Sequence, residues 1–226
     1  MKRVIATVVG QSNERGADAS RLRIANIGAP CGDPVTPKGV ANNGSWWPIV
    51  VENIYNSDGI WLRIHNAAIG SSSIIQHWCG DSVGDGSGTI YNKDDGGFDP
   101  NGYFADALTG ANASTYDDRW AFISIGQRDS VLDTSAARYQ EGLENAVNYF
   151  LDNSIKVALG FTCFKTGAET WYSTKGEVGY LAALATFSSN ASVISGANLY
   201  DELGEGVQLY DSDHMTPRGY DIAGES

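Results

Sequence analysis

A serine follows the first apolar run of the sequence in a setting that suits a nucleophile. The run at residues 4–9 leads directly into Gly10-Gln11-Ser12-Asn13. In an α/β protein, a glycine-opened turn after a strand presents a serine hydroxyl at the carboxyl end of the sheet, where such proteins keep their active sites. The same turn also suits a serine that only caps the following helix. Ser12 is therefore a candidate nucleophile whose role depends on a base elsewhere in the chain.

Three histidines could supply that base, and one of them has an acid close by. His65 lies inside an apolar run, which favours a sheet-face side chain, and His77 lies in a helical stretch that could line a pocket edge. His214 follows the last apolar run and stands three residues after Asp211. A carboxylate at that spacing can accept the imidazole Nδ1–H, which leaves Nε2 to take the proton of Ser12. An Asp-x-x-His loop is equally typical of a capped or exposed turn.

A tetrahedral intermediate of acyl transfer also needs hydrogen-bond donors for its oxyanion. The loop after the second apolar run offers the backbone N–H of Gly70 or Ser71 at the start of a helix, where the helix dipole favours an anion. The loop after the third run offers the side chains of Gln127 and Arg128. Ordinary glycine turns would account for both loops equally well. The role of these donors, like that of Ser12, therefore depends on the other residues of the site.

The elements that must position these residues can be predicted from the apolar pattern. Near-continuous apolar runs of this length suit strands that are covered on both faces, as in a parallel sheet. The five runs occupy residues 4–9, 61–69, 120–125, 156–163 and 207–210. Strands that alternate with helices predict a three-layer α/β/α sandwich on a five-stranded parallel sheet with right-handed crossovers.

Helical periodicity is clearest between the third and fourth runs. There the spacing predicts a helix that Asp133 or Thr134 caps and that ends before Asn153. A second helix is predicted from about residue 177 to residue 187, and shorter ones after residues 71 and 99. Two polar stretches, at residues 31–57 and 80–102, are predicted to be loops. Their Gly, Asn, Asp and Ser content is typical of a phage tail or bacterial surface protein.

Composition excludes several classes of function. The 226 residues carry 15 Lys and Arg against 27 Asp and Glu, a formal charge of −12, which disfavours nucleic acid because phosphate contacts need dense basic patches. A hydrophobic fraction of 42% with 19% charged residues is typical of a globular protein and not of a membrane protein. The length fits one domain, residues 1–226, with no signal peptide, either cytoplasmic or excised from a longer protein. Cys31, Cys79 and Cys163 are expected to be free thiols.

Aromatic residues fall in or near the loops expected to surround the site. Trp47 lies in the first polar stretch, Trp78 follows the second apolar run next to His77, and Trp171-Tyr172 follow the fourth run. Flat aromatic faces cover the apolar face of a sugar ring, whereas an acyl-chain tunnel needs a continuous aliphatic lining. Trp47, Trp78 and His77 are therefore candidate substrate-binding residues, although burial statistics predict that at least half of the tryptophans lie in the core.

Four sequence blocks stand in order at the ends of the predicted strands. They read Gly-Gln-Ser-Asn at 10–13, Asn-Ala-Ala-Ile-Gly-Ser-Ser-Ser at 66–73, Gly-Gln-Arg-Asp at 126–129 and Asp-Ser-Asp-His at 211–214. This quartet resembles the SGNH (GDSL-like) hydrolase superfamily, and in particular its carbohydrate-esterase branch, whose first block reads GQSN. The ending at residues 214–220 is also similar to the family's His-x-x-Pro-x-Gly-Tyr. The resemblance covers residues 10–220.

The resemblance implies a flavodoxin-like fold and a serine esterase that removes O-acetyl groups from a glycan without a metal or another cofactor. It implies that Ser12 is the nucleophile, His214 the base and Asp211 the acid that orients it. The same fold would also suit a non-catalytic glycan-binding module or a lipid or thioester hydrolase. Neither a nucleic acid nor a membrane is an expected partner.

Two departures from the family pattern leave the oxyanion donors open. Ser71 stands where the family often has a second glycine, so the backbone donor is Gly70 or Ser71. Arg128 stands where the third block usually has asparagine, after Gln127. Either of these two side chains could donate to the oxyanion.

Overall fold

The computed structural model describes residues 2–10, 36–37, 47–80, 102–111, 115–161 and 167–198. The strands in these ranges are β1 (Arg3–Val9), β2 (Thr36–Pro37), β3 (Trp61–Asn66), β4 (Asp118–Ile123), β5 (Lys156–Phe161) and β6 (Val193–Asn198). The helices are α2 (Trp47–Asp58), η2 (Ile74–Trp78), α3 (Tyr103–Ala111), α4 (Gln127–Val131), α5 (Ala136–Asp152), α6 (Glu169–Trp171), η4 (Tyr172–Gly176) and α7 (Glu177–Thr186). The segments η2 and η4 are π-helical turns.

The strands form one sheet in the order β2-β3-β1-β4-β5-β6, and every neighbouring pair is parallel. Without the two-residue strand β2, the five longer strands follow the flavodoxin-like order, in which the second strand of the chain lies beside the first and the others follow on its far side. The parallel α/β fold expected from the sequence is thus confirmed. The fifth long strand is β6, whereas the run at residues 207–210 lies outside the described residues.

One face of the sheet packs against α2. Alternate side chains of β1 point to opposite faces, and Val4, Ala6 and Val8 join the cluster that contains Trp47 and Val51 of α2. All of these side chains are at least nine-tenths buried. The helix α2 lies almost wholly in the stretch at residues 31–57 that was predicted to be a loop, so that prediction is wrong for residues 47–57.

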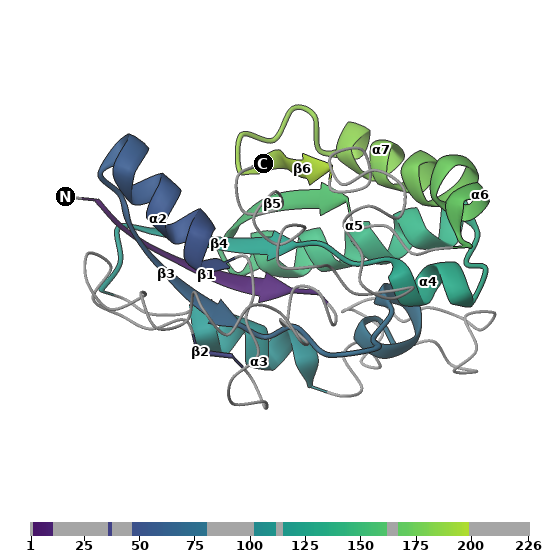
Figure 1. Ribbon diagram of the computed structural model, residues 1–226, viewed down its shortest axis with the longest axis horizontal. Coiled ribbons are helices and arrows are strands. Elements are labelled where there is room, and N and C mark those ends of the chain that lie inside the picture. The colour runs from purple at the N-terminus through teal and green to yellow at the C-terminus, as the bar shows by residue number, and fades with distance from the viewer. Residues whose placement is uncertain are drawn as a thin grey trace.

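The other face packs against α3, α5 and α7, which completes the three layers (Figure 1). The largest buried side chains of this layer come from all three helices and from the sheet, and they include Phe104, Phe150, Tyr180, Ile123 and Phe161. The helix α3 lies very close to β3, because a Cβ added at Gly110 would stand 1.9 Å from Cδ2 of His65. His65 thus lies in a strand beneath α3, as its place in an apolar run predicted.

The helices α5 and α7 occupy the ranges that periodicity predicted. The N-cap of α5 is Ser135, whose Oγ accepts the N–H of Arg138 at 3.3 Å, and not Asp133 or Thr134. Asp133 instead has a φ of +53° in the turn before the cap. Asp, Thr and Ser are all favoured N-cap residues, so the sequence alone did not distinguish Ser135 from the two residues before it. Cys79 is a buried free thiol as expected; Cys31 and Cys163 lie outside the described residues.

Candidate active site at the carboxyl edge of the sheet

The strand order reverses at β1, which has β3 on one side and β4 on the other. Loops that leave β1 and β4 at their carboxyl ends therefore diverge, and a crevice opens between them in proteins of this architecture. The blocks that begin at residues 10, 66 and 126 all follow these three strands. Figure 1 shows α4 at the end to which the arrows of β1 and β4 point. The structure thus brings the second and third blocks and Gly10, the described residue of the first block, to one edge.

Hydrogen bonds tie the loop after β3 to the end of β1. The backbone N–H of Ile69 donates to the carbonyl of Gly10 at 3.0 Å. The hydroxyl of Ser72 lies 2.8 Å from the carbonyl of Ile69 and 3.2 Å from that of Gly10, and it accepts the indole N–H of Trp78 at 3.0 Å. Ser72 is fully buried, so these bonds are protected from water. The second block and Gly10 are consequently held in a fixed arrangement.

Asp129, the last residue of the third block, ties that block to the second. Its Oδ2 accepts the backbone N–H of Ile74 at 3.0 Å, and its Oδ1 lies 3.5 Å from the backbone nitrogen of Ile75. These two N–H groups open η2, directly after the second block, and have no partner inside the helix. The carboxylate therefore caps a helix 55 residues away in the chain. No role for Asp129 was predictable from its position in the sequence, where its only signal was a carboxyl group next to side chains that donate hydrogen bonds.

Burial dominates the ionisation of Asp129. The side chain has no exposed surface, and this desolvation raises its pKa to about 7 even though the N–H groups of Ile74 and Ile75 and the nearby Arg128 favour the charged form. Desolvation disfavours a carboxylate, whereas N–H donors and a cation favour it. The carboxyl group of Asp129 thus titrates near neutral pH inside the element that connects the two blocks.

The third block turns from β4 into α4 at Gly126. This residue has a φ of +153° with a ψ of −17°, a backbone conformation that side chains with a Cβ rarely adopt. Gln127 follows as the first residue of α4 and is buried, with an exposed fraction of 5%, while Arg128 is half-buried. The hydroxyl of Ser130 donates to the carbonyl of Gln127 at 2.7 Å and closes the first turn.

The second block presents two backbone donors at the same edge. Among the described residues, no acceptor is bonded to the backbone N–H of Gly70 or Ser71. Ser71 is exposed and has a φ of +58°, so a serine here adopts the left-handed conformation that glycine favours. Glycine would adopt this conformation without the strain that a Cβ imposes. Both N–H groups remain candidate oxyanion donors.

His77 lies beside the two blocks and is half-buried. Its Nδ1 accepts the backbone N–H of Ser73 at 3.1 Å, which requires a neutral ring with the proton on Nε2. Burial and the nearby charge of Arg128 both lower the pKa of His77. The imidazole therefore stays neutral at pH 7 and holds the loop at Ser73, close to the residues predicted to surround the site.

The two tryptophans predicted to bind substrate are buried instead. Trp78 has no exposed surface, and its ring packs edge-on against Tyr103 and Phe104 with centroids 5.4 and 5.1 Å away. Trp47 is 6% exposed and stacks on Phe122 with centroids 5.6 Å apart. Neither ring offers a free face to a sugar. The prediction is wrong for both, because packing partners far away in the sequence decide whether an aromatic side chain reaches the surface.

The proposed triad falls beyond the ranges that the structure covers. Ser12, Asp211 and His214 all lie outside the described residues, so their arrangement stays a prediction from the sequence. Within those ranges, no group of three His, Cys, Asp or Glu side chains could hold a metal ion. Nor does the described part of the chain contain a helix with the length and apolar character that a membrane span requires.

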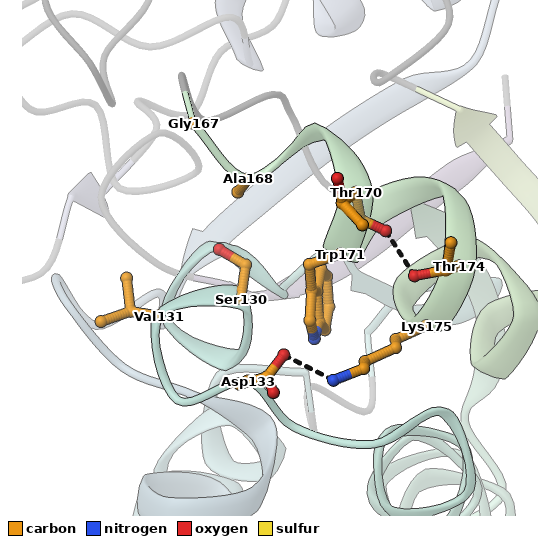
Figure 2. A pocket seen from close by; sticks show the side chains of 9 residues that line it. All are labelled: Ser130, Val131, Asp133, Gly167, Ala168, Thr170, Trp171, Thr174 and Lys175. Carbon is orange, nitrogen blue, oxygen red and sulfur yellow. Dashed lines mark hydrogen bonds and ion pairs between the residues drawn. The ribbon is translucent and has the colours of Figure 1, made fainter.

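A hollow of about 310 Å³ lies between α4 and α6 (Figure 2). Its first lining residue in the chain, Ser130, directly follows the third block. The hollow is lined by residues of α4, of the turn that follows it, and of the segment from Gly167 through α6 into η4. These residues are Ser130, Val131, Asp133, Gly167, Ala168, Thr170, Trp171, Thr174 and Lys175. Figure 1 shows α6, like α4, at the end of the sheet to which the strands point.

Solved structures of several esterases share this fold at low sequence identity. A member of the lipolytic G-D-S-L family from Veillonella parvula superposes with a TM-score of 0.57 and 14% identity, over 98% of this chain and 94% of that one. Est24, a carbohydrate acetylesterase from Sinorhizobium meliloti, has a TM-score of 0.56 and 12% identity, over 99% and 95% of the two chains. A variant of Axe2, an acetyl-xylooligosaccharide esterase from Geobacillus, has a TM-score of 0.60 and 14% identity, over 98% and 90%.

No protein-family model matches the sequence, and no curated protein is similar to it. The structural comparison therefore shows the fold, and it agrees with the fold that the four sequence blocks implied. Function does not follow from a shared fold, so it must be argued from the site.

Proposed function

We propose that the chain is a serine esterase that removes O-acetyl groups from a carbohydrate. The observation that carries the proposal is a set of hydrogen bonds at one edge of the sheet, in which Asp129 joins the third block to the second and Gly10 is joined to the second by Ile69 and Ser72. Ser12 is two residues beyond Gly10, and two residues of chain reach at most ~7 Å. A chain segment of this length would allow the proposed nucleophile to lie near the donors at Gly70.

The proposed reaction is acyl transfer in two steps. His214, oriented by Asp211, takes the proton of Ser12 while Oγ attacks the ester carbonyl, and the N–H of Gly70 or Ser71 stabilises the oxyanion. Collapse of the intermediate breaks the bond to the sugar oxygen, which takes the proton from His214 and leaves as a hydroxyl group. Water then attacks the acetyl-enzyme with His214 again as base, which releases acetate and restores the Ser12 hydroxyl.

The side-chain oxyanion donor is Gln127 or Arg128. Gln127 begins α4 directly after the glycine turn, and its burial suits a donor that water does not reach. Arg128 lies close enough to His77 to lower the pKa of that imidazole, and as a permanent cation it suits substrate binding as well as oxyanion stabilisation. If Gln127 is the donor, Gln127→Ala lowers kcat by roughly 10²-fold with little change in KM, and Arg128→Ala acts mainly on KM.

Acetate release tests the proposal. The purified chain is incubated with a panel of O-acetylated polysaccharides and with p-nitrophenyl acetate and octanoate, beside Ser12→Ala and the control Ser188→Ala, an exposed serine after α7. Ser12→Ala and His214→Ala should each lower kcat on the order of 10³-fold or more, and the double variant should lose little further activity. Ser188→Ala should match the unsubstituted protein.

Three results would contradict the proposal. Absence of hydrolysis of every ester would favour a glycan-binding module without turnover. Octanoyl or thioester substrates cleaved faster than acetyl esters would favour a lipid or thioester hydrolase. Losses in Ser12→Ala and His214→Ala that add up in the double variant would mean that the two side chains do not act as one unit.

A further inference from the structure

We infer that the hollow between α4 and α6 binds one uncharged sugar ring of the carbohydrate, next to the residue that carries the acetyl group. This inference rests on the proposed function and adds a binding site to it. A volume of about 310 Å³ lies at the lower end of the roughly 300–1,000 Å³ of ligand pockets and suits a single small ring. Its lining combines apolar surface with hydroxyl groups and one ion pair.

The apolar part of the hollow is held rigidly in place. The indole N–H of Trp171 donates to the carbonyl of Thr134 at 2.8 Å, and the ring packs edge-on against Tyr139 and Tyr172. A Cβ at Gly176 would lie 2.5 Å from the same ring, so the glycine gives the ring its room. The ring cannot rotate without losing these contacts. The ring is itself only 5% exposed, so it forms a rigid floor, and the apolar surface that a ligand can contact comes from Val131, which is 52% exposed. A preorganised floor of this kind lowers the entropic cost of binding a ligand.

Hydroxyl groups and polar side chains stand around that floor. Figure 2 shows Thr170 and Thr174 on one side of Trp171 and Ser130 on the other. Thr174 donates its hydroxyl proton to the carbonyl of Thr170, which leaves the oxygen of Thr174 able to accept. Several hydroxyls beside apolar surface match a sugar ring, whose faces carry C–H groups and whose rim carries hydroxyls. An acyl chain would form no hydrogen bond with any of these hydroxyls.

The charges in the hollow favour a neutral ligand. Nζ of Lys175 lies 2.6 Å from Oδ1 of Asp133, so the one cation of the lining is paired with its one anion. An anionic sugar would have to compete with Asp133 for the ammonium group and would then face an unpaired carboxylate. A neutral sugar can bond to the outer atoms of both groups without separating them.

The position of the hollow links it to the reaction. Gln127 and Val131 are the first and last residues of α4, so Val131 is about 6 Å along the helix axis from Gln127. The segment that carries Trp171 follows β5, which pairs with β4. Two loops from neighbouring strands therefore enclose the hollow beside the third block. A sugar chain bound there would have its next residue close to the proposed oxyanion donors.

Methyl NMR and affinity measurements test the inference. The Ser12→Ala protein is titrated with O-acetylated xylooligosaccharides, which are neutral, and with O-acetylated oligogalacturonides, which are anionic. The methyl signals of Val131, which is 52% exposed in the hollow, should shift with the neutral probe, and those of Val178, 51% exposed on α7, should not. Val131→Trp should raise Kd for the neutral probe at least about tenfold, and the matched control Val178→Trp should not change it.

Each other outcome overturns one of the two proposals. No shift at Val131 with either probe, an equal effect of the two tryptophan substitutions, or tighter binding of the anionic probe would remove the sugar site, whether or not esters are hydrolysed. Shifts at Val131 with octanoate but not with the sugar probe would assign the hollow to an acyl chain. Shifts with the neutral probe in a protein that cleaves no ester would keep the sugar site and remove the esterase.

Discussion

Replacement of Asp129 by asparagine should change how stability depends on pH. The carboxyl group is fully buried, and its pKa is raised to about 7 from an ordinary value of 3.8. Between these two values, the folded protein holds a proton at this site that the unfolded chain has already lost. Unfolding therefore releases a proton in this range, and the contribution of Asp129 to stability is full below about pH 4 and is lost as pH rises through about 7.

The size of the effect follows from the two pKa values. One proton released on unfolding changes the unfolding free energy by about 1.4 kcal/mol per pH unit, so the loss between pH 5 and pH 8 comes to about 3 kcal/mol. Asparagine keeps one acceptor for the N–H of Ile74 but has no proton to lose. Its own cost, about 1–3 kcal/mol for one impaired buried hydrogen bond, does not depend on pH. The two unfolding free energies should thus converge, or cross, as pH rises.

Urea unfolding at pH 5, 6, 7 and 8 measures this difference for the unsubstituted protein and Asp129→Asn. The control is Asp58→Asn, an exposed residue at the end of α2, whose curve should run parallel to that of the unsubstituted protein. Carbon NMR of the carboxyl group of Asp129 gives its pKa directly. If the unsubstituted protein instead gains stability relative to Asp129→Asn as pH rises, the N–H groups of Ile74 and Ile75 outweigh burial, and the reasoning is refuted.

Two further predictions concern His77 and Gly110. Because burial and the charge of Arg128 both lower the pKa of His77, an NMR titration should find its midpoint below 6.5, with the proton of the neutral ring on Nε2. A midpoint above 6.5 would contradict the effect of burial and of the Arg128 charge. The unfolded chain then takes up that proton first, so acidification below about pH 6.5 removes stability. Gly110→Ala should lower the unfolding free energy by about 1–3 kcal/mol because its Cβ would overlap His65, whereas Ser188→Ala should change it by less than about 0.5 kcal/mol. A neutral effect of Gly110→Ala in urea unfolding would mean that α3 can move away from β3.

The elements that were predictable from the sequence are those buried in a regular way. In β1, six consecutive residues are buried because helices cover both faces of the sheet, and the sequence shows this as an uninterrupted apolar run. In α5, the buried face alternates with an exposed one, and the sequence shows this as helical periodicity. In both cases the type of each residue reflects whether it is buried or exposed, so the local pattern was enough to predict the element.

The elements that could not be predicted either bury few side chains or contain residues with a low propensity for their secondary structure. The helix α2 begins at Trp47-Pro48 in a polar stretch and is exposed at Glu52 and Asn56, so its few buried side chains do not stand out as a pattern. The strand β6 reads Val-Ile-Ser-Gly-Ala-Asn, and a Cβ at Gly196 would lie 3.0 Å from the backbone of Gly160. Glycine is needed there for close approach of two strands, yet it reads as a turn in the sequence.

The site divides in the same way. The blocks at Gly10, Gly70 and Gln127 were located correctly at strand ends, because a polar block after an apolar run is a local signal. Their connection was not found, since Asp129 acts on the backbone of Ile74, and a hydrogen bond to a backbone group leaves no trace in the identity of its partner. A sequence can be searched for two side chains that would pair with each other. It does not show which backbone N–H group a side chain bonds to.

The hydrogen bond between Asp129 and Ile74 also indicates how the candidate oxyanion donors at this edge would be held in position. Oxyanion stabilisation is effective when the donors are already oriented before charge develops, because no energy is then spent on reorganisation in the transition state. The N–H groups of Gly70 and Ser71 lie between two anchored points: Ile69 is bonded to Gly10 on one side, and Ile74 is bonded to Asp129 on the other. Gly10, Ile74 and Asp129 are buried and Ile69 is partly buried, so water has little access to these hydrogen bonds. The exposed donors would thus owe their orientation to buried side chains that never touch the substrate.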